Sequence, residues 1–347
     1  MILAARSFSL PGAQEGIKQY FRANWSQLLS LEIWADAAKQ IIFSLGPACG
    51  CVITLSSYND FQRNCHLDAI VIAIANSITS VFSGAVVFAI LGYMAHESGR
   101  EVLDVVQPGP GLAFLAYPEV VTKLPSASLM AVLFFTMLIS LALGSIFGAF
   151  ETVITAAEDQ WPSLRQYKSF VVFFTALTMA LLGLTFTCPA GIHMFTLFNE
   201  SAPSWNLLLF AFLEVIAVSW VYGVDKFIEH LSGMVPNLST FSKIYWKLTW
   251  KYLTPLILFT LLLFDLSNFG HVGFEDYIYP IPVQFLGYAI TAASLIWIPL
   301  VAWYERRKST EADSACWLLK PTNDWGGRQK AYGGTPGDQE LNTTQIE

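Results

Sequence analysis

Long apolar stretches separated by short polar segments organise this chain. A helix needs about 20 apolar residues to cross the hydrocarbon core of a bilayer. Seven stretches approach or exceed that length, at residues 33–57, 69–94, 127–150, 169–187, 205–224, 252–268 and 283–304. The second stretch contains no charged residue at all. The pattern therefore predicts an all-α polytopic membrane protein with seven spans.

The first stretch is interrupted in its middle by Gly46-Pro47-Ala48-Cys49-Gly50. Proline lacks a backbone donor and clashes with the preceding turn, so the helix should break there. Irregular backbone at membrane depth is tolerated only where protein or a water-filled cavity covers it. Secondary transporters bind ions and substrate at such broken helices. A simple proline kink is the alternative, and the break alone does not decide between the two.

Composition supports the membrane assignment and narrows the function classes. Of 347 residues, 54% are hydrophobic and 13% are charged, whereas soluble domains carry about 25% charged residues. The net charge of −7 comes without a basic patch, so we expect no nucleic-acid partner. The five cysteines are scattered without metal-binding spacing, and they predict neither a disulfide framework nor a zinc site.

The distribution of basic residues in the loops predicts the orientation of the chain. One set of alternate loops holds most of them, namely Arg63, Arg165, Lys168, Lys226, Lys243, Lys247 and Lys251. Arg306-Arg307-Lys308 follows the last span. Since such loops stay on the cytoplasmic side, the N-terminus should be extracellular and the C-terminus cytoplasmic. Residues 305–347 are polar and should form a flexible cytoplasmic tail.

Uncharged polar residues recur at helical spacing inside the first two spans. Gln40 and Ser44 are four residues apart, as are Asn76 and Ser80, so each pair shares one helix face. Their oxygens suit a dehydrated alkali cation, and their N–H and O–H donors suit a halide. The alternative is that they join helices by hydrogen bonds, which contribute roughly 0.6–2 kcal/mol each.

Glu214 stands alone in the apolar fifth span. A carboxyl group there costs about 3 kcal/mol unless it is paired or protonated, so it is a candidate functional residue. A protonated acid that bonds a neighbouring helix is the structural alternative. The sequence contains no pattern of a catalytic triad, phosphate loop or metal cluster, and we expect no enzyme.

Several motifs, in order, resemble the neurotransmitter:sodium symporter family. They run from Trp34 to Gly46 and then comprise Ser57-Tyr58-Asn59, Ala75-Asn76-Ser77-Ile78-Thr79-Ser80, Gly109-Pro110-Gly111-Leu112-Ala113-Phe114, Tyr117-Pro118 and Trp220-Val221-Tyr222-Gly223. The resemblance covers about residues 5–305. This family is itself the standard case of broken-helix transporters, so the helix break and the motifs together count as one indication of a transport site.

The resemblance implies the second inverted repeat and two trailing spans of the broken-helix symporter fold. Residues 1–32 would be the end of a preceding span and an extracellular segment. Residues 33–231 would form the five-span repeat, with an extracellular plug in loop 95–126, and residues 232–304 the trailing spans. The family has twelve spans, and the first five have no counterpart here. Half of each binding site would therefore be missing.

The resemblance also implies roles for individual residues. It assigns sodium ligands (Ser44, Asn76, Ser145 and the carbonyl of Leu141) and chloride ligands (Gln40, Ser44, Asn76 and Ser80). The substrate pocket would comprise Phe43 as an aromatic lid, Leu45, Gly46, Cys49, Gly50, Ser145 and Ala149. Tyr58 and Asp159 would belong to the cytoplasmic gate. No cofactor and no metal other than sodium is implied.

Three positions depart from the family pattern. Gly144 stands where many animal members carry an acid, Asn199 where the outer gate has one, and Cys49 where relatives often place a bulky aromatic residue. Gly144 puts one sodium contact in doubt, and Asn199 puts the outer gate in doubt. The smaller side chain of Cys49 leaves more room, which argues against a pocket for the smallest amino acids.

The expected function is sodium- and chloride-coupled symport of an amino acid or amine neurotransmitter at the plasma membrane, by alternating access. Without the first five spans, the chain should be inactive alone. Two alternatives remain open. One is a short isoform that does not transport but associates with full-length transporter subunits, and the other is an incomplete gene model of an ordinary transporter.

Overall fold

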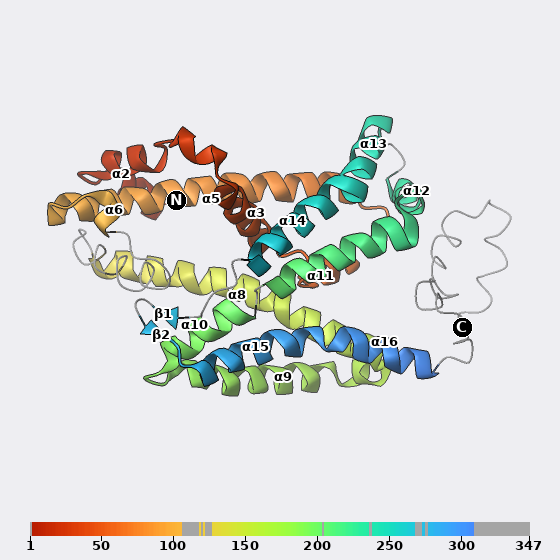
Figure 1. The fold of residues 1–347 in the computed structure, drawn as a ribbon. Helices are drawn as coiled ribbons and strands as arrows, with labels where there is room; N and C mark the ends of the chain where they lie inside the picture. Colours follow the sequence, from red (N-terminus) through yellow and green to blue (C-terminus); the bar gives the residue numbers. More distant parts are fainter. Residues whose placement is uncertain are drawn as a thin grey trace. The chain divides into compact units, whose positions relative to one another are not determined.

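A computed structural model describes residues 2–105, 118, 121, 127–202, 205–235, 238–267, 273–274 and 277–308. The chain divides into two compact units. The first comprises residues 1–46, 51–57 and 66–156, and the second comprises residues 47–50, 58–65 and 157–347. In the described residues, six helices are long and apolar enough to cross a membrane (Figure 1). The all-α polytopic class is confirmed.

The six long helices agree with six of the seven predicted spans. They are Cys65–Ser98, Ala127–Gln160, Pro162–Thr187, Gly191–Met234, Thr240–Ser267 and Ile281–Arg307. The remaining predicted span, 33–57, is divided into two shorter helices, α3 (Leu31–Leu45) and α4 (Cys51–Ser57). Most of the predicted plug loop and tail, at residues 106–117, 119–120, 122–126 and 309–347, lies outside the described residues.

The first unit begins with short helices and continues with long ones. α1 (Ile2–Phe8), α2 (Ala13–Tyr20) and a 3-10 turn η1 (Trp25–Leu29) precede α3 and α4. α5 (Cys65–Ser98), the short α6 (Val102–Val105) and α8 (Ala127–Gln160) follow. α8 extends ten residues beyond its predicted end at 150, because residues 151–160 contain no glycine or proline and Pro162 is the next helix breaker.

α2 lies against the C-terminal half of α5 at unusually close range (Figure 1). A Cβ added to Gly16 would lie 1.8 Å from the Phe88 carbonyl oxygen, and one added to Gly92 would lie 2.5 Å from the Gly12 oxygen. Small residues let backbones approach in this way. Beside the contact, Leu10, Ala13, Ala89, Ile90 and Tyr93 form a buried apolar cluster. This docking was not anticipated from the sequence.

The second unit contains the remaining helices. They are η3 (Pro162–Tyr167), α9 (Lys168–Gly183), η4 (Leu184–Thr187), α10 (Gly191–Ser201), α11 (Trp205–Ile216), the π-helical η5 (Ala217–Gly223) and α12 (Val224–Met234). α13 (Thr240–Leu248), the π-helical η6 (Thr249–Leu253), α14 (Thr254–Ser267), α15 (Ile281–Leu295) and α16 (Trp297–Lys308) complete it. Between α14 and α15, β1 (Gly273–Phe274) pairs antiparallel with β2 (Tyr277–Ile278), a short ladder that the apolar pattern did not predict.

A seam of small and polar residues joins α10 and the start of α11 to α15. The Thr291 hydroxyl donates to the Ser201 carbonyl oxygen at 2.8 Å, and the Asn206 amide donates to the Ser294 hydroxyl at 2.9 Å. Gly287 supplies the space that Ser201 occupies. Helices in lipid associate through such close contacts and hydrogen bonds, since burial of apolar surface gives little driving force there.

The helical hydrogen bonding of the last span is irregular between α15 and α16, although Ile296 keeps right-handed helical angles and its N–H donates to the Ala292 carbonyl oxygen at 3.0 Å. Pro299 has no N–H to donate to the carbonyl of Leu295, so one bond of the helix is missing there. α16 then continues to Lys308, beyond the predicted end of the span at 304, and places the Arg307 guanidinium 3.9 Å from the Trp303 ring centroid. The first residues of the predicted tail are therefore helical.

Candidate functional site

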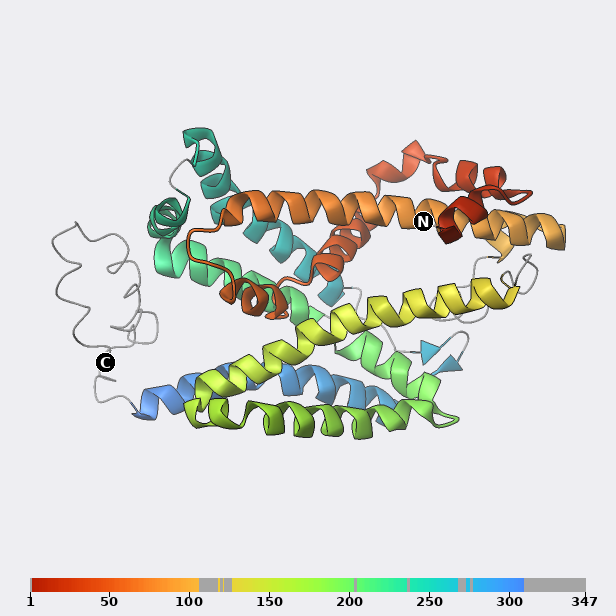
Figure 2. The same ribbon diagram turned by 180° about the vertical axis from the view of Figure 1, so that it is seen from behind.

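The predicted helix break is present in the first span (Figure 2). α3 ends at Leu45, and the Gly46 N–H closes its last turn by donating to the Ile42 carbonyl oxygen at 3.0 Å. Gly46, Ala48 and Gly50 have φ of 63°, 62° and 78°, in the left-handed region. Left-handed residues cannot continue a right-handed helix. The segment is thus a true break, not a kink in one continuous helix.

Two predicted ion ligands meet next to this break. The Ser44 hydroxyl, on the last turn of α3, donates to Oδ1 of Asn76 on α5 at 3.0 Å. The contact brings two oxygens from different helices together, directly before a segment whose backbone groups have left the helical ladder. Oxygen clusters of this kind can replace part of the hydration shell of a cation.

Gln40 and Ser80 lie one helical turn from the Ser44–Asn76 contact, on α3 and α5 respectively. Their spacing of four residues keeps each on the same helix face as its neighbour. Both side chains are exposed. Together the four residues offer amide and hydroxyl groups along one pair of helices, and their assignment to chloride stays a prediction.

α8 carries the predicted residues of the second sodium site. Leu141 and Ser145 are four residues apart on one face, and Ala149, a predicted pocket residue, follows at the same interval. Gly148, next to Ala149, lies where α4 approaches, because a Cβ added there would be 3.9 Å from Cys51 Cβ and from Leu55 Cδ1. A Cβ added to Gly144 would meet nothing within 4 Å among the described atoms, so the position where relatives carry an acid has room for a side chain.

The two predicted gate residues lie in different settings. Tyr58 follows the end of α4 directly and is exposed. Asp159 lies in the last turn of α8, and its carboxylate pairs with the Arg165 guanidinium at 2.9 Å. Both side chains are largely exposed, so the pair contributes at most about 1 kcal/mol to stability. Arg165 was not anticipated, although its position six residues on, across the Pro162 turn, could have indicated a partner.

The predicted pocket residues are exposed or half-buried. Phe43 is 59% exposed and Cys49 is exposed as well, and Leu141, a predicted sodium ligand, is 64% exposed. Leu45, Gly46 and Gly50 are half-buried at the break. Glu214 lies half-buried on α11, whose main neighbour is α14. None of these described side chains is fully buried within its own unit.

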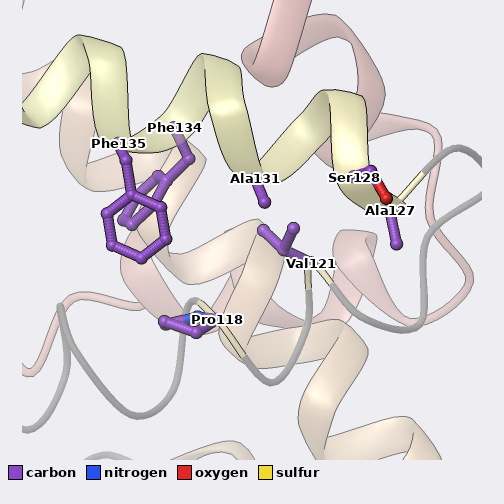
Figure 3. A pocket seen from close by; sticks show the side chains of 7 residues that line it. All are labelled: Pro118, Val121, Ala127, Ser128, Ala131, Phe134 and Phe135. Atoms are coloured by element: carbon purple, nitrogen blue, oxygen red, sulfur yellow. The ribbon is translucent and has the colours of Figure 1, made fainter.

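An apolar cavity of about 330 Å³ lies at the other end of α8 (Figure 3). Pro118, Val121 and the α8 residues Ala127, Ser128, Ala131, Phe134 and Phe135 line it. Apart from the hydroxyl of Ser128, its side chains are hydrocarbon, and none of them belongs to the predicted ion or substrate site. The cavity therefore does not mark that site.

Comparison with known proteins gives a consistent result. The profile of the "Sodium:neurotransmitter symporter family" matches residues 1–309. The mouse sodium- and chloride-dependent neutral and basic amino acid transporter B(0+) is 36% identical over 331 residues, and the Xenopus laevis sodium- and chloride-dependent glycine transporter 1 is 39% identical over 336. Each alignment covers 94% of this chain and 52% of the relative.

The bovine sodium-dependent dopamine transporter is 36% identical over 339 residues, which cover 96% of this chain and 48% of that protein. The chain thus spans about half the length of the curated relatives it matches. The profile match extends from the first residue to the end of the last span and includes the broken helix. The chain belongs to the sodium:neurotransmitter symporter family.

Proposed function

We propose that this chain carries one half of the ion and substrate site of a sodium- and chloride-coupled symporter for an amino acid or amine. The observation that carries the proposal is the contact between Ser44 and Asn76 at the break between α3 and α4. The contact brings oxygens of two helices together beside backbone groups that no longer form helical hydrogen bonds. Broken-helix transporters bind ions at such places. Membership in a transporter family supports this class of activity over an enzyme.

Sodium would take oxygens from Ser44 and Asn76 at one position, and from Ser145 and the Leu141 carbonyl at another. Chloride would accept hydrogen bonds from the donors of Gln40, Ser44, Asn76 and Ser80. A halide at that place would offset part of the sodium charge, since two opposite charges in a site of low dielectric attract strongly. The names of the relatives, several of them sodium- and chloride-dependent transporters, support both ions.

The broken segment would hold the substrate. Phe43 on α3 would cover it, Leu45 to Gly50 would offer backbone groups, and Ala149 on α8 would also line the pocket. Tyr58 and Asp159 would close the cytoplasmic side during alternating access. In the plasma membrane, the N-terminus would be extracellular and the C-terminus cytoplasmic, as the basic loops predict.

A second polypeptide segment would complete the site, because broken-helix transporters bind substrate and ions at the interface between two repeats, and this chain spans about half the length of its relatives. We propose that the half of the relatives without a counterpart here supplies this segment, and that the 347-residue chain alone does not transport. Association with full-length transporter subunits as a non-transporting short form stays the alternative.

The test is sodium-dependent uptake of a panel of amino acids and amines in cells. The chain would be expressed alone and together with the unmatched N-terminal half of the Xenopus glycine transporter 1. Surface labelling would control for delivery. We expect uptake only from the combination. Saturable, sodium-driven uptake by the chain alone would overturn the half-site proposal.

Two variants test the ions in the active combination. Ser44→Ala should raise the sodium concentration needed for half-maximal uptake, because a coordinating oxygen is lost. Ser77→Ala is the matched control, since its hydroxyl already bonds the Ala73 carbonyl oxygen of its own helix at 3.0 Å. Replacing chloride with gluconate should reduce uptake, and Ser80→Asp should restore it because a fixed carboxylate replaces the halide charge. If wild-type uptake did not depend on chloride, the chloride assignment would be wrong, and the four residues would serve only as interhelical hydrogen-bond partners.

A further inference from the structure

Two π-helical segments meet in the second unit, at the ends of neighbouring spans. η5 (Ala217–Gly223) and η6 (Thr249–Leu253) are joined by side-chain bonds to backbone. The Ser219 hydroxyl donates to the Trp250 carbonyl oxygen at 2.9 Å, and the Trp220 indole N–H donates to the Lys251 carbonyl oxygen at 3.0 Å. π-helical turns occur frequently at functional sites. None of the residues named here belongs to the proposed ion or substrate site.

Lys251 occupies the corner that the two segments form. Its ammonium lies 5.6 Å from the Trp220 ring centroid and 5.7 Å from that of Tyr252. The two rings stand nearly perpendicular, with an interplanar angle of 88° and centroids 6.1 Å apart. Ring faces attract a cation without using its N–H groups as conventional donors to oxygen. The ammonium is thus held in one place while its donors stay available for an oxygen anion.

The surroundings of Lys251 favour an anion and make the site accessible. Trp220 is 55% exposed and Tyr252 is 54% exposed. The carboxylate of Asp225 forms an ion pair with Lys247. Residues 225–251 contain four lysines and two carboxylates, so the segment keeps a positive balance. Trp246 and Phe227 pack on Trp250, with ring centroids 5.0 and 5.4 Å away, and support the backbone of η6.

The depth of the site points to a lipid as the source of the anion. Trp220 and Lys251 lie where the apolar stretches 205–224 and 252–268 end or begin, which is the level of the headgroups. Tryptophan and tyrosine concentrate at that level, and lysine extends its ammonium towards it. Basic pockets between transmembrane helices on the cytoplasmic side bind anionic headgroups. We propose that Lys251, held between Trp220 and Tyr252, binds the headgroup phosphate of an anionic phospholipid.

The test uses the 347-residue chain purified in a neutral detergent. Native mass spectrometry would measure the apparent affinity for a short-chain phosphatidylglycerol, with the matching zwitterionic phosphatidylcholine as the comparison of zero net charge. Lys251→Gln should weaken phosphatidylglycerol binding roughly fivefold, the effect expected for one basic residue at the membrane surface. Lys251→Arg should keep the affinity within about twofold, because it retains the charge and stacks on the rings.

Lys243→Gln is the matched control, since this lysine lies two turns earlier on α13 and has the same charge. It should change phosphatidylglycerol binding by less than about twofold if the site is specific. Circular dichroism and gel filtration would establish that each variant is folded. An equal loss in Lys243→Gln would overturn the proposal in favour of diffuse charge attraction. Equal binding of phosphatidylcholine, or displacement by equimolar inorganic phosphate, would also overturn a headgroup site.

Discussion

A single methyl group at Gly16 should separate α2 from α5. The added Cβ would lie 1.8 Å from the Phe88 carbonyl oxygen and 2.9 Å from the Gly92 Cα. Both are backbone atoms of α5, so no side-chain rotation can relieve the overlap. α2 must move away, and the buried cluster around Ala13 and Ala89 must then open.

The cost follows from the kind of overlap. Overpacking a tight contact typically costs about 1–3 kcal/mol and occasionally more. If the contact between α2 and α5 loses this much stability, the fraction of molecules in which α2 is undocked rises roughly 5- to 150-fold. The effect should be local, because α2 is a short helix that its contact with α5 holds in place.

Limited proteolysis measures the undocked fraction directly. Trypsin would cut after Lys18 or Arg22, both exposed on or just after α2, but it needs the local backbone to unfold. When opening is fast, the cleavage rate follows the open population. Gly16→Ala should therefore be cut faster than wild type. Gly183→Ala is the control, because an added Cβ there meets nothing within 4 Å and its φ of −61° suits alanine. Equal cleavage rates in Gly16→Ala and wild type would refute the backbone-overlap argument.

Three further predictions concern other parts of the chain. Thr291→Val should lower the free energy of unfolding by roughly 0.6–1.7 kcal/mol in a detergent denaturation series, because it removes the 2.8 Å bond to the Ser201 carbonyl oxygen. Ala48→Gly should raise it by up to about 1 kcal/mol, since glycine adopts a φ of 62° without the Cβ penalty; a decrease would contradict this reasoning. In translocated chains, the exposed sequon Asn24-Trp25-Ser26 should carry a glycan, whereas Asn237, outside the described residues, should not; glycan mapping that found the reverse would invert the orientation.

Local sequence determined the spans and the break. Span length follows from uninterrupted apolar composition, because every backbone group in lipid must be bonded within its own helix. The break at Gly46 to Gly50 follows from proline and glycine chemistry, which acts within one turn. The end of α8 was placed too early for a related reason. The apolar run stops at residue 150, but the helix continues until a residue that breaks it.

Part of the site was also visible in the sequence. Ser44 and Asn76 stood out as polar residues in apolar spans, and family motifs gave their proposed role. The spacing of four placed Gln40 beside Ser44 and Ser80 beside Asn76, since helical periodicity is a local property. The sequence alone did not decide between an ion site and interhelical hydrogen bonds, because the same donors and acceptors serve both.

Contacts between distant segments were decided only by the tertiary structure. Ser44 and Asn76 are 32 residues apart, and nothing local requires their oxygens to meet at 3.0 Å. The approach of α2 to α5 depends on glycines 76 residues apart, Gly16 and Gly92, facing one another. The Trp220–Lys251 corner likewise depends on which faces of two spans pack together. Apolar composition drives every span into lipid equally, so the choice of partner face rests on shape and hydrogen bonds that only the packed helices reveal.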